Sequence, residues 1–373
     1  MTPTTSSTTK CLSAPSVGFW TRREFLRGAA GVVALHSGVP APPHFAYVAS
    51  GAGSLHVFQL RGEQWTPIQQ LPSRAPACIV LCPGEQTLYV ANEVEEHDGL
   101  PRGTVEAFHI DPLSGRLTLS SRTPLSLSAT RPRHMALSPD GKLLAVAAYG
   151  GGVYNLLPVA KDGSLGQPCG IFKDAGCGPK PAQASAHPHT LIFHGPQLLA
   201  TDFGSDRLNV FAVEDGRPGR RIHRSTGEGS GPGACVLHPA GSFLYVWHAL
   251  EGTLATYRYE AGILSEPIQR VRWANIPEGE QSLALHPSGR TLYTTQPTLT
   301  AWRIDAKSGL LSWQKALPGA ATWIAPIGES LFALDAQSDS IAQLPLDPST
   351  GQPQRKATMA RVQQPRSLAL KTT

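Results

Sequence analysis

One two-strand phrase recurs along the chain, and this repetition restricts the possible folds more than any other feature. Each copy has a run of strand-forming residues, a turn rich in proline or glycine, and a second run dense in strand formers. Four copies superpose without gaps: ACIVLCPGEQTLYVANE (77–93), RHMALSPDGKLLAVAAY (133–149), GACVLHPAGSFLYVWHA (233–249) and QSLALHPSGRTLYTTQP (281–297). PHTLIFHGPQLLATDF (188–203) fits with one deletion, and TWIAPIGESLFALDA (322–336) fits more loosely. Their equal internal spacing indicates structural repeats.

A third strand follows each phrase and ends near a glycine-containing hairpin, after which a fourth, more polar strand begins. Four short strands in a repeat of roughly 42–56 residues are typical of a β-propeller blade. Six complete copies begin near residues 76, 132, 188, 232, 280 and 322. The seventh is split, with its first strand in QPRSLALKTT (364–373) and its second and third in HFAYVASGAGSLHVFQL (44–60). We therefore predict an all-β, seven-bladed β-propeller over residues 42–373, with four-stranded blades and a ring closed by the C-terminal strand.

Residues 1–41 have the pattern of an export signal. TRREFLRGAAGVVAL (21–35) contains two consecutive arginines, Arg22 and Arg23, and then Phe25, Leu26 and a short, weakly apolar run. This is typical of a twin-arginine signal peptide, whose apolar run is too short to span a membrane. Small residues favour cleavage after about Ala41; an ordinary disordered, basic N-terminus is the alternative. We expect a periplasmic protein that uses the twin-arginine export machinery and has no stable membrane anchor.

Charge and cysteine content narrow the possible partners and cross-links. The formal net charge is +5, of which residues 1–41 contribute +3, so nothing indicates a nucleic-acid partner. We also expect a monomer.

Five cysteines remain after the predicted signal, an odd number that cannot all pair. Cys169 and Cys177 flank a glycine-containing loop, and the sequence leaves open whether they form a disulfide.

The propeller topology predicts where reactive side chains gather. The first strand of each blade lines the central channel, and the end of the antiparallel second strand lies beside its start, so both rows of residues meet at one mouth. There we expect bases, acids and cations that suit an anionic small molecule: Glu93, Arg133, His134, Tyr149, His187, His189, Asp202, His248, Gln281 and Arg366. A single such histidine more often bonds a neighbouring carbonyl, so the prediction rests on the cluster. His187 and His189 could share a metal, but the chain has no familiar metal motif, and we expect neither metal nor cofactor.

Four stretches carry a family resemblance: ANEVEEHDGLPRGTVEAFHIDPLSGRL (91–117), RPRHMALSPDGKLLAVAAYGGG (131–152), SAHPHTLIF (185–193) with TDFGSDRLNVF (201–211), and GEGSGPGACVLHPAGSFLYV (227–246). In combination they resemble the 6-phosphogluconolactonase family of seven-bladed propellers, which also includes the fungal carboxymuconate cyclase. The resemblance covers residues 44–373 and implies metal-free hydrolysis of a sugar lactone to the open acid at the channel mouth. It leads us to interpret His189 as the base, with Glu93 orienting it or sharing its role, and His187 as a further catalytic residue. The expected substrate-binding residues are Arg133, His134, Tyr149, Asp202, Gln281 and Arg366.

Three positions depart from the family pattern. Gly233, Ala249 and Pro297 stand where the family usually has an arginine, a glutamate and an arginine. The resemblance therefore implies that any chemistry lies on the blades nearer the N-terminus. Two alternatives remain open. The chain could be a non-catalytic periplasmic propeller that binds a small anionic ligand or a protein partner. It could also be a carboxymuconate-type cycloisomerase, which is disfavoured because its arginines are the ones absent.

Overall fold

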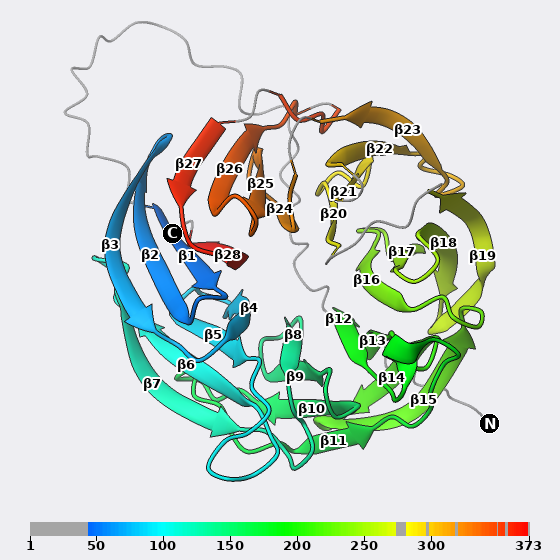
Figure 1. The fold of residues 1–373 in the computed structure, drawn as a ribbon, viewed down its shortest axis with the longest axis horizontal. Helices are drawn as coiled ribbons and strands as arrows, with labels where there is room; N and C mark the ends of the chain where they lie inside the picture. Colours follow the sequence, from blue (N-terminus) through cyan, green and yellow to red (C-terminus); the bar gives the residue numbers. More distant parts are fainter. Residues whose placement is uncertain are drawn as a thin grey trace, which may run out of the picture. The chain divides into compact units, whose positions relative to one another are not determined.

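Seven four-stranded antiparallel sheets form a ring in the computed structural model, which confirms the predicted propeller (Figure 1). The structure describes residues 44–273, 281–295, 298–317, 320–348, 350–354 and 357–371, and these blades belong to one compact unit, Pro42–Thr373. The predicted signal peptide and Pro297 lie outside the described residues. Within the described ranges, no helix is both long and apolar enough to cross a membrane.

The strands are built in the predicted order, from the channel outward. The innermost strands are β4 (Pro76–Leu81), β8 (Pro132–Leu137), β12 (Pro188–His194), β16 (Pro232–Leu237), β20 (Leu283–Leu285), β24 (Trp323–Ile327) and β28 (Pro365–Lys371). The second strands are β5 (Thr87–Asn92), β9 (Leu143–Ala148), β13 (Gln197–Asp202), β17 (Phe243–His248), β21 (Thr291–Thr294), β25 (Ser330–Asp335) and β1 (His44–Ser50). The blades are numbered 1–7 in the chain order of their innermost strands, so that blade 1 contains β4 and blade 7 contains β28.

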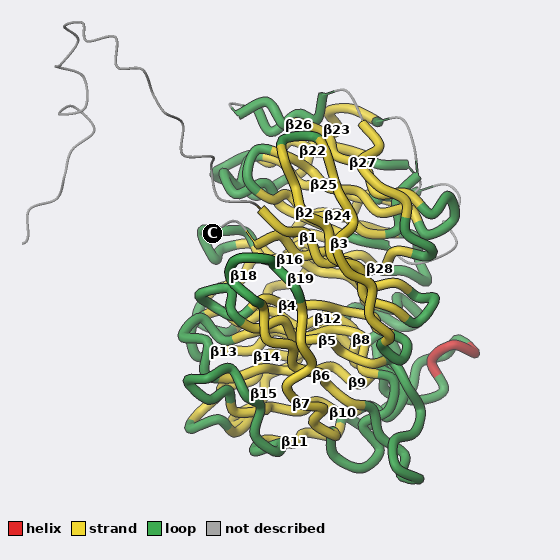
Figure 2. Tube along the Cα trace, turned by 90° about the vertical axis from the view of Figure 1, so that its left-hand side faces the viewer, coloured by secondary structure: helices red, strands yellow, loops and turns green. Residues whose placement is uncertain are grey.

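The outer half of each blade completes the sheet. The third strands are β6 (Thr104–Ile110), β10 (Val153–Pro158), β14 (Arg207–Glu214), β18 (Thr253–Glu260), β22 (Thr300–Ile304), β26 (Ser340–Pro345) and β2 (Ser54–Arg61). The outermost strands are β7 (Leu117–Pro124), β11 (Gly170–Lys173), β15 (Arg217–Ser225), β19 (Ile263–Arg272), β23 (Leu311–Ala316), β27 (Ala357–Arg361) and β3 (Gln64–Pro72). A short 3-10 helix, η1 (Pro181–Gln183), lies in the loop between β11 and β12 and projects from one side of the ring (Figure 2).

Burial explains why the repeated phrase is so apolar. All six residues of β5 are buried, because the second strand of a blade is covered on both faces by neighbouring blades. The outermost strand β3 instead consists of exposed and partly buried residues apart from the buried Trp65. The polar character of the fourth strand of each repeat thus follows from its place at the rim.

The chain ends meet in blade 7, as predicted. β28 pairs with β1 in antiparallel register from Phe45 opposite Lys371 to Ser50 opposite Pro365. The C-terminal segment thereby becomes the innermost strand of the blade that also contains β1, β2 and β3. Closure of the ring in this way leaves no blade without a partner on either side.

Tyrosines of the repeated phrase tie successive blades together. The hydroxyl of a second-strand tyrosine donates to the carbonyl of a glycine in the outer hairpin of the next blade. The four pairs are Tyr47 with Gly115 (3.1 Å), Tyr89 with Gly163 (2.8 Å), Tyr245 with Gly309 (3.0 Å) and Tyr293 with Gly351. All four glycines have a positive φ, which favours glycine at these turns.

Cys169 and Cys177 do not form a disulfide in this structure. Cys169 and Cys177 are both free and exposed, and the Cys169 thiol donates to the carbonyl of Gly216 at 3.1 Å. The remaining three described cysteines are free as well. The ring is therefore held by strand pairing, packing and hydrogen bonds among the described residues.

Candidate active site

A cavity of about 820 Å³ occupies the channel, and residues of all seven innermost strands or of the positions next to them line it. Six of the predicted site residues lie on its wall: Glu93, Arg133, His134, His189, Gln281 and Arg366. They come together because the innermost strands surround the channel, as Figure 1 shows for β4, β8, β12 and β28, and because these residues lie at or near the starts of those strands or, for Glu93, directly after the second strand β5. Residues from distant parts of the sequence thus share one hollow.

Glu93 is the centre of an ion-pair cluster. Its Oε1 atom is 2.6 Å from Arg133 Nε and 3.4 Å from Arg131 Nη2, and its Oε2 atom is 2.7 Å from Arg366 Nη1. The Glu93 side chain is only 8% exposed. Burial alone would raise the pKa of Glu93, but Arg133 and Arg366 lower it below its ordinary value. Glu93 is therefore an ionised anchor for arginines.

Arg133 also rests on an aromatic stack. Its guanidinium carbon lies 4.3 Å from the centroid of the Tyr149 ring, and the His187 ring stacks on Tyr149 at 4.5 Å with an angle of 8° between the planes. The His187 Nδ1 atom donates to the Tyr149 carbonyl at 2.8 Å. Tyr149 and His187 therefore lie beside the cavity wall and support Arg133. The structure places the predicted catalytic His187 behind Tyr149 and not on the cavity wall.

His189 and His134 are the two imidazoles on the wall. The His189 Nδ1 atom is 2.9 Å from Thr190 Oγ1, and the His134 Nδ1 atom accepts the backbone N–H of Leu191 at 3.2 Å. Burial lowers the pKa of His189 to about 3, with further contributions from Arg133 and His134, and it lowers the pKa of His134 to about 4. Both rings are therefore neutral near pH 7, and His134 carries its proton on Nε2.

The Nε2 edge of His189 faces Gly233. A Cβ atom added to Gly233 would lie 3.6 Å from His189 Nε2, which is an ordinary van der Waals contact. Gly233 does not adopt a left-handed backbone conformation, so the backbone does not require glycine there. The absent side chain thus leaves room beside the imidazole that we predicted to be the base.

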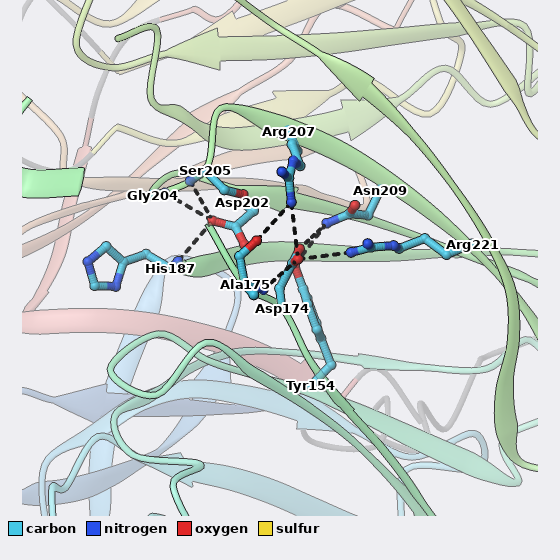
Figure 3. A network of polar contacts seen from close by, with 10 residues as sticks. All are labelled: Tyr154, Asp174, Ala175, His187, Asp202, Gly204, Ser205, Arg207, Asn209 and Arg221. Atoms are coloured by element: carbon cyan, nitrogen blue, oxygen red, sulfur yellow. Dashed lines mark hydrogen bonds and ion pairs between the residues drawn. The ribbon is translucent and has the colours of Figure 1, made fainter. Parts of the chain in front are cut away.

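Asp202 does not line the cavity, and Figure 3 shows it within a network of polar contacts beside His187. It is fully buried, and its Oδ1 atom accepts the backbone N–H groups of His187, Gly204 and Ser205 at 2.8–3.0 Å. Its Oδ2 atom has no hydrogen-bond partner among the described residues. The expectation that Asp202 contacts substrate therefore does not agree with its position. It fixes the backbone of the loop that carries His187.

A second buried carboxylate, Asp174, lies next to this loop. It binds Arg221 at 2.9 Å, Asn209 at 3.0 Å and Arg207 at 3.4 Å, as Figure 3 shows. These contacts join the end of β11 to the third and fourth strands of blade 3. They form a structural network between two blades, away from the cavity wall.

Two further expectations can be compared with the structure. His248 is fully buried, with Nε2 3.0 Å from the Tyr257 hydroxyl, and it does not line the cavity. No group of three or more His, Cys, Asp or Glu residues in the described ranges could hold a metal ion. His187 stacks on Tyr149 and does not line the cavity, whereas His189 does, so the two histidines do not share a place on the cavity wall.

The sequence reasoning also missed residues on the wall. Trp323 at the start of β24, Gln337 and Gln364 line the cavity. Trp323 belongs to the copy of the phrase that aligns only loosely, because its turn is shorter. If Thr322 and Trp323 are aligned with Gln281 and Ser282, they fall among the residues at the starts of the innermost strands, which we predicted to line the channel.

Several curated proteins with a similar sequence are named 6-phosphogluconolactonase. A family model described as a seven-bladed β-propeller lactonase matches residues 46–370. A 6-phosphogluconolactonase from Bacillus subtilis is 25% identical over 326 residues, which are 82% of this chain and 90% of the relative. A 6-phosphogluconolactonase from Pectobacterium carotovorum is 25% identical over 336 residues, which are 84% of this chain and 94% of the relative.

Solved structures agree with the fold. The periplasmic gluconolactonase of Pseudomonas aeruginosa superposes with a TM-score of 0.77 at 25% identity, covering 88% of this chain and 99% of that one. A putative 6-phosphogluconolactonase from Bacteroides fragilis superposes with a TM-score of 0.78 at 21% identity, covering 90% and 99%, and supports the fold alone. The family model spans nearly all of the ring that the structure describes. The chain therefore belongs to the family of seven-bladed β-propeller lactonases.

Proposed function

We propose that this protein is a lactone hydrolase that opens the cyclic ester of a sugar acid at the channel mouth. One observation carries the proposal: a neutral imidazole, His189, and two guanidinium groups, Arg133 and Arg366, line one cavity of a lactonase-family propeller. Ester hydrolysis needs a base that accepts a proton from water and donors that stabilise the oxyanion, and these side chains supply both.

His189 is the proposed base. In the tautomer that donates Nδ1–H to Thr190 Oγ1, its Nε2 lone pair can accept a proton on the side of Gly233, where there is room for a methyl-sized group. A water molecule there gives a proton to Nε2 as its oxygen bonds to the lactone carbonyl carbon. The ring C–O bond then breaks, and the proton passes from Nε2 to the departing ring oxygen, which yields the hydroxy acid. A pKa of about 3 makes His189 available but weakly basic, and negative charge that develops near Arg133 would raise its basicity.

The arginines are the proposed oxyanion donors. Arg133 and Arg366 are both held by Glu93, so their guanidinium groups are oriented before substrate binds. Glu93 makes no described hydrogen bond to His189, which changes its proposed role from orienting the base to orienting the cations. Such preorganisation reduces the reorganisation needed in the transition state.

A pH-indicator assay of acid release tests the proposal. We expect the purified protein to open glucono-δ-lactone faster than its spontaneous hydrolysis, and Arg366→Ala to lower kcat/KM roughly 100-fold, as for loss of one oxyanion donor. The matched control is Arg258→Ala, which removes an exposed arginine of β18 that stacks on Phe243 away from the cavity. If no member of a panel of sugar, phosphorylated sugar and muconate lactones is opened above background, the proposal is wrong and the binding-protein alternative is favoured.

We also propose that the chain is exported by the twin-arginine route to the periplasm. The proposal rests on Arg22 and Arg23 followed by Phe25 and Leu26, and on similarity to a periplasmic gluconolactonase. Replacement of both arginines by lysine is expected to retain the protein in the cytoplasm, as measured by cell fractionation. An unchanged periplasmic yield would contradict this proposal.

A further inference from the structure

The cavity wall is divided by charge. Its carboxylate, guanidinium and imidazole groups all come from four consecutive blades, 7, 1, 2 and 3: Glu93, Arg133, His134, His189 and Arg366. The described wall residues of blades 4, 5 and 6 carry no charge. A substrate that fills the cavity therefore meets two chemically different sectors.

Trp323 is the largest side chain among the described wall residues of the uncharged sector. It is partly exposed, lines the cavity at the start of β24, and also packs against the apolar cluster between blades 6 and 7. That packing holds the indole in place beside the cavity. A fixed, partly exposed indole offers a flat surface for the C–H face of a sugar ring.

Two glutamines lie on the cavity wall where blades 6 and 7 adjoin: Gln337 follows β25 of blade 6, and Gln364 directly precedes β28 of blade 7. Gln337 and Gln364 are exposed on the cavity wall, and neither side-chain amide hydrogen-bonds another described residue. Each amide can donate two hydrogen bonds and accept two, which matches the mixed donor and acceptor character of sugar hydroxyls. An aromatic surface beside unused amides favours a neutral polyhydroxylated group over an alkyl chain or a phosphate.

The two sectors adjoin where blade 7 meets blade 6 and where blade 3 meets blade 4, but Trp323 and His189 lie on opposite sides of the channel. In Figure 1, β24 with Trp323 lies across the ring from β8 and β12, which carry Arg133 and His189. A volume of about 820 Å³ lies within the range of cavities that enclose drug-sized ligands and is more than one lactone ring needs. If one ring reacts at His189, a second ring has room at Trp323.

We propose that the preferred substrate is an aldonolactone that carries a neutral glycosyl group, with its lactone ring at His189 and its glycosyl ring on Trp323. This inference rests on the proposed lactone hydrolysis. A phosphate on the substrate is disfavoured, because both arginines of the charged sector are assigned to the lactone carbonyl and the uncharged sector offers no cation among its described residues.

Comparison of two lactones in the pH-indicator assay tests the inference. We expect kcat/KM for 4-O-glucosyl-glucono-δ-lactone to exceed that for glucono-δ-lactone. Trp323→Ala should lower kcat/KM for the glucosylated lactone about tenfold and that for the simple lactone less than twofold. Trp323→Phe should retain most of the preference. The matched control is Trp313→Ala, which removes a tryptophan that is 65% exposed on the outermost strand β23.

The possible failures are distinguishable. Turnover of glucono-δ-lactone without a preference for the glucosylated lactone, or equal loss on both lactones in Trp323→Ala, would contradict this inference alone. If neither lactone is opened, the proposed hydrolysis is wrong, and calorimetric titration with the stable open acid of the glucosylated lactone decides the inference. Binding that Trp323→Ala abolishes and Trp313→Ala leaves intact would support a sugar site, whereas no binding to the parent protein would overturn it.

Discussion

Single side chains in this propeller differ in role according to small differences in position. His187 and His189 are two residues apart, yet only His189 reaches the cavity wall, because the strand begins between them with irregular pairing. Tyr149 and His187 support Arg133, and Asp202 supports His187 through the backbone. The sequence predicts which residue types gather at the mouth. The direction of each side chain depends on a local irregularity in the strand pairing, which the sequence does not predict.

Asp202 allows a pH-dependent test of this support. Burial raises the pKa of Asp202 to about 6, with a further contribution from Asp174, while an unfolded aspartate titrates near 3.9. The native state thus prefers the protonated form, and ionisation lowers stability progressively as pH rises from about 4 to 6. An asparagine can accept the same N–H bonds without the charge. We expect Asp202→Asn to have a higher Tm than the parent at pH 7.5, with the difference shrinking towards pH 4.

The matched control for Asp202→Asn is Asp206→Asn. Both carboxylate oxygens of Asp206 accept hydrogen bonds, including those from the N–H groups of Gly229 and Gly231, so the asparagine loses an acceptor and should lower Tm. Thermal unfolding followed by circular dichroism gives both values. A lower Tm of Asp202→Asn at pH 7.5 would mean that the ionised carboxylate stabilises the loop.

At the scale of strands, the repeated phrase encodes both the sheet and the contact with the next blade. The second strand supplies apolar residues that neighbouring blades bury, and in four blades a tyrosine that bonds a glycine carbonyl of the next hairpin. Blade order and strand order were predictable, because both follow from the spacing of the phrase. The position of Trp323 on the cavity wall was not predictable, because the shorter turn of its copy obscures the alignment with the other copies.

The tyrosine contacts predict a measurable stability difference. Tyr245→Phe removes the hydroxyl that donates to Gly309 and leaves a carbonyl without that partner, so the free energy of unfolding should fall by about 1–2 kcal/mol. Tyr47→Phe should act similarly through Gly115, and the two effects should add because the blades are not adjacent. Denaturant unfolding of the single and double variants measures this. If neither single variant has a lower free energy of unfolding than the parent, these hydrogen bonds make no net contribution to stability.

The whole molecule depends on closure of the ring. β28 contributes the innermost strand of blade 7 and also the cavity residue Arg366, so one C-terminal segment serves both fold and site. The sequence predicted this closure, because only a split seventh copy accounts for both ends of the chain. It did not predict that Glu93 of blade 1 joins Arg366 of blade 7 to Arg133 of blade 2, since ion pairs between neighbouring blades depend on three-dimensional distances.

Removal of residues 365–373 tests the closure. The truncation removes one of the two strand partners of β1 and exposes Val48 and other apolar residues of the cluster beneath it, so we expect a large fall in Tm or failure to fold. Removal of residues 372–373 alone, which lie beyond β28, is the control and should change little. A truncated protein that melts within a few degrees of the parent would argue against the role of β28 in closing the ring.

The most direct test of the account is the rate of lactone opening by the His189→Ala variant. Loss of a general base lowers the rate roughly 10²–10⁴-fold, so we expect kcat for glucono-δ-lactone to fall by that factor while the variant keeps the Tm of the parent. His187→Ala should lower activity less, because His187 supports Arg133 through Tyr149 without lining the cavity. A His189→Ala variant that opens the lactone at the parent rate would contradict the assignment of the base and place the chemistry elsewhere on the ring.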